Sequence, residues 1–182
     1  PHGCSEQMTS QLFPMLFFPE FIPYASDEFL AEDESANLGK IVENIRTGIK
    51  ILESRVNWEG GVGTWQNEQN ASWWTTAYVA HFLVEARKKG YPVNENDLTS
   101  ILDYLEEKCG SNSYTQFSFW NGQTYQVEEK VMKELVYSLY VLALAERPNA
   151  SIMNLYKGKP DKLTSESKVL LATQVEPIYR RS

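Results

Sequence analysis

The chain has 182 residues, of which 42% are hydrophobic and 13% aromatic, and this is enough apolar material for a packed core. Its formal net charge of -7 argues against a nucleic acid or an anionic membrane surface as partner, because either would require a basic face. No stretch approaches the uninterrupted apolar length of a membrane-spanning helix, so membrane contact is not expected from this segment.

The apolar spacing in the first half of the chain is helical. Apolar residues at intervals of three and four predict a helix over residues 38–56 with one buried stripe. Ser72 is a suitable N-cap for a second helix, from Trp73 to Lys89, which should end at Gly90. These two segments predict a helical core for this half.

The second half continues the helical pattern. Helices are expected from the apolar positions over 98–110, from Val127 to Leu142, over 152–156, and from a Thr164 or Ser165 cap through Gln174, before Pro177. No segment alternates at period two, so strands should be at most short pieces in loops. Helix pairs recurring at roughly 50 residues predict an all-α stack of helical hairpins.

Two predicted loops combine aromatic residues with glycine and asparagine, over 57–65 and 114–122. One interpretation is that the rings fold back as lids over helix ends. The other is that they line a surface beside a reactive group. The sequence leaves both open.

Cysteine and histidine are scarce. Cys4 and Cys109, with only His2 and His81 beside them, are too few for a disulfide scaffold or a zinc site, so no metal or cofactor is expected. A Cys4–Cys109 bridge stays open. Cys109, before a glycine at a helix end, is expected to be a buried apolar residue, and His81 to be structural.

The N-terminal stretch Pro1-His2-Gly3-Cys4-Ser5-Glu6-Gln7 carries the chemistry. On the first turn of a helix, residues three apart face the same side, with Cβ atoms about 5–6 Å apart, so the Cys4 sulfur can reach the Gln7 carbonyl. Loss of ammonia would leave an internal thioester, a stored electrophile that amines attack with thiolate as leaving group. Gly3 permits the backbone entry that such a ring requires.

Residues 1–10 resemble the thioester motif of the alpha-2-macroglobulin family, close to P-Y-G-C-x-E-Q, which the complement thioester proteins share. Residues 60–65, 74–93 and 140–145 resemble segments downstream of the thioester in bacterial members of the family. The resemblance therefore covers residues 1–175.

The resemblance implies a thioester domain folded as an α/α toroid, of which this chain would be about half. Residues 1–182 would then be part of a single thioester domain, excerpted from a much larger multidomain protein. Such proteins are broad-spectrum endopeptidase inhibitors of host defence. The resemblance implies a single-turnover covalent trap in the periplasm or outside the cell, not an enzyme, with target proteases and the other domains of the parent chain as partners.

The resemblance also assigns individual residues. Cys4 would be the sulfur partner and Gln7 the acyl partner, so no catalytic residue is expected. The remaining assignments are motif support by Gly3, Ser5 and Glu6 and shielding of the ester by His2, Trp58, Trp65 and Trp120.

Three departures from other members bear on these assignments. His2 stands where tyrosine is common, and Ser5 stands where vertebrate members have glycine. Residues 117–122 lack the histidine that some complement proteins use for transfer to hydroxyls, which favours direct attack by lysine amines.

Two other classes remain open. The chain could be a helical scaffold or binding module without a functional thioester, acting through its aromatic loops. It could instead be a glycan-cleaving enzyme that uses paired carboxylates from Asp33, Glu34 and Glu59. The acidic residues from Asp27 to Glu34 are also typical of a solvated loop, and a Cys4–His2 pair has poor geometry for nucleophilic catalysis.

Overall fold

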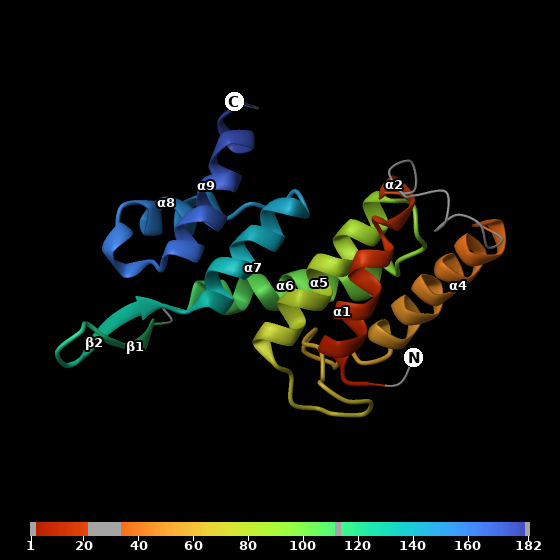
Figure 1. Cartoon of the computed structure of the whole chain (residues 1–182), viewed down its shortest axis with the longest axis horizontal. Helices are drawn as coiled ribbons and strands as arrows, with labels where there is room; N and C mark the ends of the chain where they lie inside the picture. The colour runs from red at the N-terminus through yellow and green to blue at the C-terminus, as the bar shows by residue number, and fades with distance from the viewer. Residues whose placement is uncertain (1–2, 22–33, 112–113, 181–182) are drawn as a thin grey trace. The chain divides into compact units, whose positions relative to one another are not determined.

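Helices dominate the computed structural model, which describes residues 3–21, 34–111 and 114–180 (Figure 1). The chain divides into two compact units, residues 1–101 and 102–182. In the described part of the chain, no helix combines the length and the apolarity that crossing a bilayer requires. The expected all-α class is confirmed, apart from one β-hairpin in the second unit.

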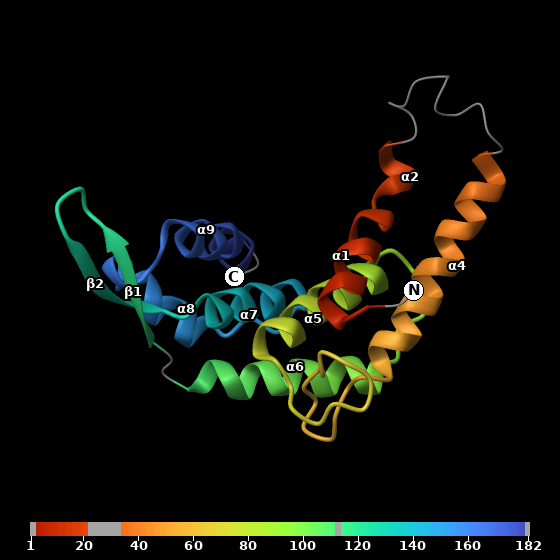
Figure 2. The same cartoon turned by 60° about the horizontal axis from the view of Figure 1, so that its bottom comes forward.

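The first unit is a cluster of helices around α1. It contains α1 (Ser5–Met15), α2 (Phe18–Phe21), α4 (Glu34–Glu53), α5 (Trp73–Lys88) and the first part of α6 (Glu95–Gly110). Helix α1 packs against both α4 and α5, and Figure 2 shows it beside them. The buried side chains of these three helices repeat at helical spacing, among them Met8, Leu12, Leu16, Ile45, Ile49, Leu52, Val79, Phe82 and Leu83.

The contact between α1 and α4 depends on a glycine. A Cβ built on Gly48 of α4 would lie 2.2 Å from Cδ1 of Leu12 on α1. No side chain fits at that distance, so Gly48 allows the two helices to approach closely.

Helix α5 begins and ends where the sequence predicts. The Ser72 side chain accepts a hydrogen bond from the Thr75 backbone N–H at 3.2 Å. At the other end, Gly90 has a φ of +82°, and the Tyr91 N–H donates to the Ala86 carbonyl at 3.0 Å. These bonds satisfy backbone groups that the helix leaves unpaired at its ends.

The second unit joins helices to a hairpin. It contains the end of α6, β1 (Tyr114–Trp120), β2 (Tyr125–Val131), α7 (Lys133–Leu144), α8 (Ala150–Lys157), the 3-10 turn η2 (Pro160–Lys162) and α9 (Ser165–Arg180). Helix α7 packs on α9. Arg147, after α7, donates to Asp103 and Glu106 of α6 at 2.6 to 2.9 Å.

The hairpin corrects the expected helix start at Val127. Residues 125–131 form β2, antiparallel to β1, and α7 begins only at Lys133. Aromatic and threonine residues in β1 favour a strand. At the turn, the Asn121 side-chain oxygen accepts hydrogen bonds from the backbone N–H groups of Gln123 and Thr124, both at 2.9 Å. The four-residue spacing of Val127 and Val131 fits a helix. The turn that begins at Asn121, however, brings this segment beside β1, where it pairs as a strand.

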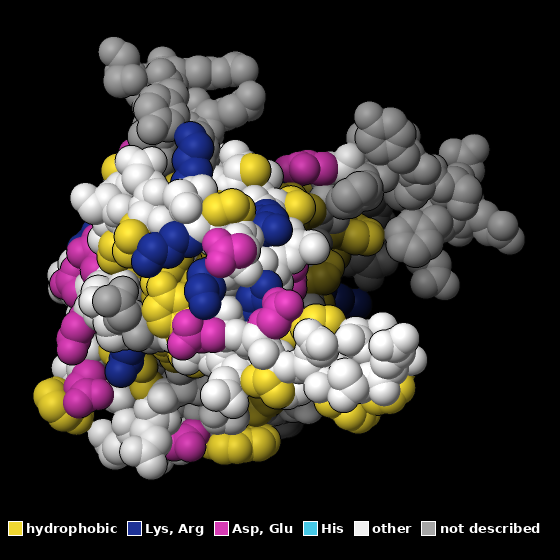
Figure 3. All heavy atoms as spheres, turned by 90° about the vertical axis from the view of Figure 1, so that its left-hand side faces the viewer, with side chains coloured by type: hydrophobic (Ala, Val, Ile, Leu, Met, Phe, Trp, Pro, Cys, Tyr) yellow, Lys and Arg dark blue, Asp and Glu magenta, His cyan; other side chains and the backbone are white. Residues whose placement is uncertain are grey.

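Of the two interpretations of residues 114–122, the structure contradicts the lid over helix ends. The segment is mostly strand, and its Phe117 and Trp120 rings are about half exposed. On the face that Figure 3 shows, acidic side chains lie among lysines and arginines, with hydrophobic groups between them.

The last helix confirms its start but not its end. The Thr164 hydroxyl accepts from the Ser167 N–H at 3.2 Å, as expected of a cap. Helix α9 is expected to end at Gln174, before Pro177, but it runs to Arg180 and contains Pro177. Proline inside a helix removes one backbone donor and can kink the helix without ending it.

Candidate functional site

Cys4 and Gln7 face each other at the start of α1. The Gln7 backbone N–H donates to the Cys4 sulfur at 3.4 Å, and the Cys4 backbone N–H donates to the Gln7 side-chain oxygen Oε1 at 3.2 Å. Cys4 is the N-cap, one position before the expected first turn, and Gln7 is the third helical residue. This reciprocal pair of bonds is a capping box, which holds the two side chains at one helix end.

The capping box has a chemical consequence at the Gln7 amide. A hydrogen bond to Oε1 draws electron density from the side-chain carbonyl carbon, and the same donor can stabilise negative charge on that oxygen. The helix N-terminus adds a positive potential at this position. The arrangement therefore favours nucleophilic attack at the Gln7 carbonyl carbon.

Gly3 lies directly against this amide. A Cβ at residue 3 would lie 3.1 Å from Gln7 Oε1, closer than an ordinary contact. A larger residue would press on the oxygen that the Cys4 N–H binds. The absence of a side chain at Gly3 therefore leaves room for the Gln7 amide.

Ser5 attaches the motif to the loop that follows α4. Its backbone N–H donates to the Thr64 carbonyl at 2.9 Å, and its fully buried hydroxyl donates to the Gly63 carbonyl at 2.7 Å. The hydroxyl also accepts from Arg55 at 3.1 Å. The Ser5 hydroxyl therefore has one hydrogen-bond acceptor and one donor as partners, which a glycine at this position could not use.

Arg55 is a site residue that the sequence analysis misses. Its Nη2 donates to the Gly3 carbonyl at 3.0 Å, and its Nη1 donates to the Ser5 hydroxyl at 3.1 Å and to the Thr64 carbonyl at 3.3 Å. The side chain is 9% exposed. The available signal was its position three residues after the buried Leu52, which places a charged residue on the apolar stripe.

Glu6 and the residues after it tie α1 to α5. The Glu6 carboxylate accepts from the buried Thr75 hydroxyl at 2.9 Å, and the Ser10 hydroxyl lies 3.2 Å from the Tyr78 hydroxyl. Within α1, the buried Thr9 hydroxyl donates to the Ser5 carbonyl at 2.7 Å. These contacts give the motif helix a fixed orientation on α5.

An aromatic cluster continues along the same two helices. The Phe13 ring meets His81 edge-on, with ring centroids 4.8 Å apart, and also neighbours Tyr78 and Phe82. Burial lowers the pKa of His81 to about 4, so the imidazole is neutral at neutral pH. His81 thus packs as an uncharged ring, in keeping with the structural role expected of it.

The proposed shielding residues lie mostly in solvent within this chain. Trp58 is 83% exposed and Trp65 is 56% exposed, both in the loop after α4. Trp120, on β1 of the second unit, is 57% exposed, and His2 lies outside the described residues. Shielding by these four residues remains a prediction.

Cys109 is chemically quiet. It is buried near the end of α6, and burial raises the pKa of its thiol to about 12. Neither cysteine is in a disulfide, so the Cys4–Cys109 bridge does not form in this structure. The expectation of a buried apolar cysteine is confirmed.

The carboxylates considered for glycan cleavage are not seen together. Asp33 and most of the acidic segment over 27–34 lie outside the described residues, Glu34 begins α4, and Glu59 is exposed. In the described ranges, no cluster of histidine, cysteine and acidic side chains is suited to hold a metal ion. The structure therefore gives this alternative no assembled site in the residues it describes.

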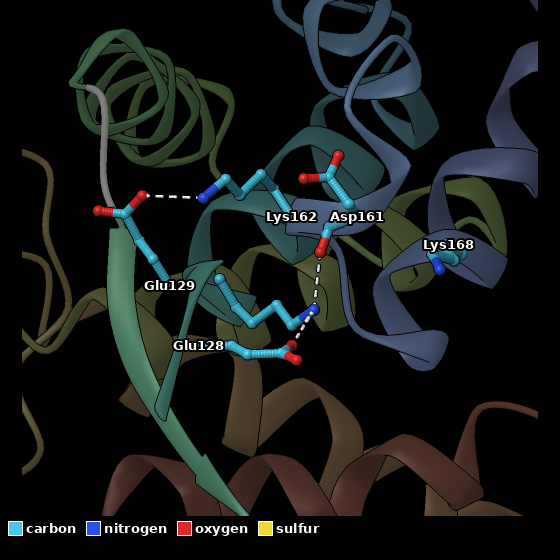
Figure 4. A pocket seen from close by; sticks show the side chains of 6 residues that line it. Glu128, Glu129, Asp161, Lys162 and Lys168 are labelled. Atoms are coloured by element: carbon cyan, nitrogen blue, oxygen red, sulfur yellow. Dashed lines mark hydrogen bonds and ion pairs between the residues drawn. The ribbon is translucent and has the colours of Figure 1, made fainter. Parts of the chain in front are cut away.

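A hollow of about 470 Å³ in the second unit is lined by charged side chains, several of which pair with one another (Figure 4). Lys130 bridges Glu128 at 2.7 Å and donates to the Asp161 carbonyl at 2.7 Å, while Lys162 pairs with Glu129 at 3.2 Å. These bonds fasten β2 to η2. Exposed pairs of this kind contribute little individually, and their effect here is to orient the hairpin.

Known proteins resemble this chain along nearly its whole length. Residues 1–173 match the family model described as the A-macroglobulin TED domain. The alpha-2-macroglobulin of Pasteurella multocida is 35% identical over 91 residues, which cover 47% of this chain and 5% of that protein.

Two solved structures share the fold. Trypsin-activated alpha-2-macroglobulin from Escherichia coli aligns with a TM-score of 0.70 and 21% identity, over 97% of this chain and 12% of its own. Salmonella alpha-2-macroglobulin reacted with methylamine aligns with a TM-score of 0.69 and 20% identity, over 95% of this chain and 11% of its own. The chain thus spans a small part of the length of the relatives it matches.

Proposed function

Since this chain belongs to the A-macroglobulin TED domain family, we propose that its Cys4 and Gln7 form an internal thioester that traps proteases covalently. The observation that carries the proposal is the reciprocal hydrogen bonding of Cys4 and Gln7 at the start of α1. It places the sulfur and the side-chain amide at the same helix end. The family match supports this class of reaction.

Formation of the ester is an exchange of nitrogen for sulfur at Gln7. The Cys4 sulfur attacks the Gln7 side-chain carbonyl carbon, the new C–S bond forms, and the C–N bond breaks with release of ammonia. The Cys4 N–H, which already binds Oε1, is placed to stabilise the oxyanion of the tetrahedral intermediate.

Trapping is an aminolysis of the same carbon. A lysine amine of the protease attacks, the C–S bond breaks, and its electron pair leaves with the Cys4 sulfur while the amine loses a proton to solvent. Gln7 is then joined to the protease through an amide bond. Each site reacts once, which makes the domain a covalent inhibitor and not a catalyst.

The wider setting follows from the family and stays part of the proposal. The chain would be about half of an α/α-toroid thioester domain within a larger inhibitor of many endopeptidases. Its partners would be proteases and the other domains of that inhibitor. It would act in host defence, in the periplasm or outside the cell.

One observation favours a second candidate, a binding module without a working ester. The Trp58 and Trp65 rings are more than half exposed, as in surfaces that bind partners through aromatic side chains. Such a module would not depend on the Cys4 sulfur. The two candidates therefore differ in their response to a single substitution.

Protease capture by the full-length protein tests the proposal. Trypsin is added, and complexes that survive denaturation are measured by electrophoresis. We expect Cys4→Ser to abolish them, because the serine oxygen is a much poorer leaving group than the cysteine thiolate. Cys109→Ser, the matched control at the buried cysteine, should leave capture unchanged. Equal capture by the Cys4→Ser variant would contradict the proposal.

A further inference from the structure

We propose that Arg55 is a positioning residue for this thioester, and that its guanidinium supplies the counter-charge for the Cys4 thiolate. The inference rests on the proposed function. It concerns a residue outside the Gly3–Gln7 motif, more than forty positions along the chain. Three features of the structure support it.

The first feature is that the guanidinium binds the residue before Cys4 and the residue after it. One nitrogen, Nη2, binds the carbonyl of the residue before the cysteine, Gly3, at 3.0 Å. The other, Nη1, binds the side chain of the residue after it, Ser5, at 3.1 Å. Arg55 therefore spans the cysteine backbone, and its planar fork holds the segment from residue 3 to residue 5 in one arrangement.

The second feature is a buried positive charge that no acidic side chain pairs with in the part of the chain that the structure describes. Arg55 is 9% exposed, and its Nε has no hydrogen-bond partner among those residues. Among the described residues it forms no ion pair, and the nearby acidic side chain of the motif, Glu6, binds Thr75 instead. Burying a cation away from any paired anion is unfavourable, so an anion that forms close to it is stabilised.

The third feature is the position of this charge at the N-terminus of α1. The helix end carries its own positive potential, which makes an added cation less favourable in the resting protein. Both fields become favourable when an anion forms at the N-cap. Cys4 occupies that N-cap, so the anion they favour is its thiolate.

The reaction produces that anion in the trapping step. An amine attacks the Gln7 carbonyl carbon, the C–S bond breaks, and the electron pair remains on the Cys4 sulfur while the amine proton passes to solvent. A charge that is already in place stabilises the leaving group without reorganisation. Arg55 thus favours cleavage of the ester by amines.

Two substitutions separate charge from hydrogen bonding in the full-length protein. Arg55→Lys keeps the charge and loses the fork, whereas Arg55→Gln keeps amide donors and loses the charge. We expect methylamine cleavage to slow about tenfold in Arg55→Gln and about threefold in Arg55→Lys, the range expected of a partly buried charge at a helix end. Arg46→Gln, an exposed position on α4, is the charge-matched control and should react as wild type.

The order of the two rates decides the inference. If Arg55 only holds the fold through hydrogen bonds, Arg55→Gln reacts at least as fast as Arg55→Lys, and the inference is overturned. It is also overturned if Arg55→Gln reacts within about twofold of wild type. Absence of any ester in the wild-type protein is a different result, because it refutes the proposed function itself.

A second measurement needs no substitution and covers the case in which Arg55→Gln fails to fold. After methylamine treatment, the released Cys4 thiol of the wild-type protein is alkylated with iodoacetate, which is anionic, or with neutral iodoacetamide. A local positive charge raises the iodoacetate rate relative to the iodoacetamide rate, compared with the same ratio in urea-unfolded protein. An equal or lower ratio in the folded protein would refute the counter-charge.

Discussion

Among single residues, Ser5 fixes the position of the Gly3–Gln7 motif through its side chain. Its hydroxyl both donates to the Gly63 carbonyl and accepts from Arg55, so it uses the two bonding directions of a hydroxyl in a fully buried position. Glycine here would leave the Arg55 Nη1 with the longer bond to Thr64 alone, at 3.3 Å. The buried Ser5 hydroxyl is therefore fully hydrogen-bonded, and it satisfies polar groups of its neighbours.

His81 makes stability depend on acid. Burial lowers its pKa to about 4, whereas the unfolded chain has the ordinary pKa of 6.5. Between these values the unfolded state binds a proton that the folded state does not, so stability falls as the pH falls from about 6.5 towards 4. Between pH 7 and pH 4.5 the loss should be about 2 kcal/mol.

Urea unfolding of the wild type and of His81→Gln at both pH values measures this contribution. Glutamine does not titrate, so the variant should lose about 2 kcal/mol less than wild type over the same interval. Other groups titrate equally in both proteins and cancel in the comparison. An identical pH dependence would show that the folded and unfolded states bind the His81 proton alike, so that burial does not lower its pKa.

Sequence reasoning could pick out Cys4 and Gln7 but not the residues that hold them in place. Cys4 and Gln7 lie three apart in one short motif, and local spacing is sufficient to bring them together. Arg55 reaches the same place only because α4 and the loop after it pack on α1. A tertiary contact of this kind has no local pattern, apart from a charged residue on an apolar stripe.

Gly48 controls the approach of α4 to α1 at the scale of elements. We expect Gly48→Ala to cost about 1–3 kcal/mol of stability, because its Cβ would collide with Leu12. Gly39→Ala, on the same helix with open space around it, should instead stabilise by about 0.5–1 kcal/mol through helix propensity.

Thermal unfolding of the two alanine variants tests the helix contact. The midpoint should fall for Gly48→Ala and rise slightly for Gly39→Ala. Because Leu12 belongs to the helix that carries Cys4 and Gln7, the first variant should also disturb the motif. Equal shifts in the two variants would mean that α1 and α4 do not approach as closely as the structure has them.

Elements with strong local signals were predictable, and the hairpin was not. Helix α5 has a serine cap, a long apolar face and a terminal glycine, and it forms where these signals place it. Strand β2 carries valines at a helix-like interval, with polar residues between them. Its pairing depends on the turn at Asn121 and on β1, which a reading of residues 125–131 alone does not contain.

Net charge acts at the scale of the whole molecule. With a formal charge of -7, the chain should not bind double-stranded DNA at about 0.1 M salt, because phosphate contacts require clustered lysine and arginine. Fluorescence anisotropy of a labelled duplex measures this directly. Binding that weakens as salt is added would reveal a basic surface that the charge balance does not predict.

The two compact units also belong to this scale. Cys4, Gln7 and Arg55 all lie in the first unit, whereas Trp120 and the hairpin lie in the second. Helical periodicity predicted the class of both units, but spacing carries no information on where the chain divides. The two solved relatives described above contain this fold in about a tenth of their length, so protection of the proposed ester is to be measured in the full-length protein.

Labelling of the full-length protein with isotopic methylamine, followed by peptide mapping, tests the central claim most directly. We expect the label on Gln7, with one thiol released at Cys4 for each label incorporated. The untreated protein should be lighter by one ammonia than its sequence requires. An untreated protein of full mass, with a Cys4 thiol that is already free and no label on Gln7, would contradict the thioester.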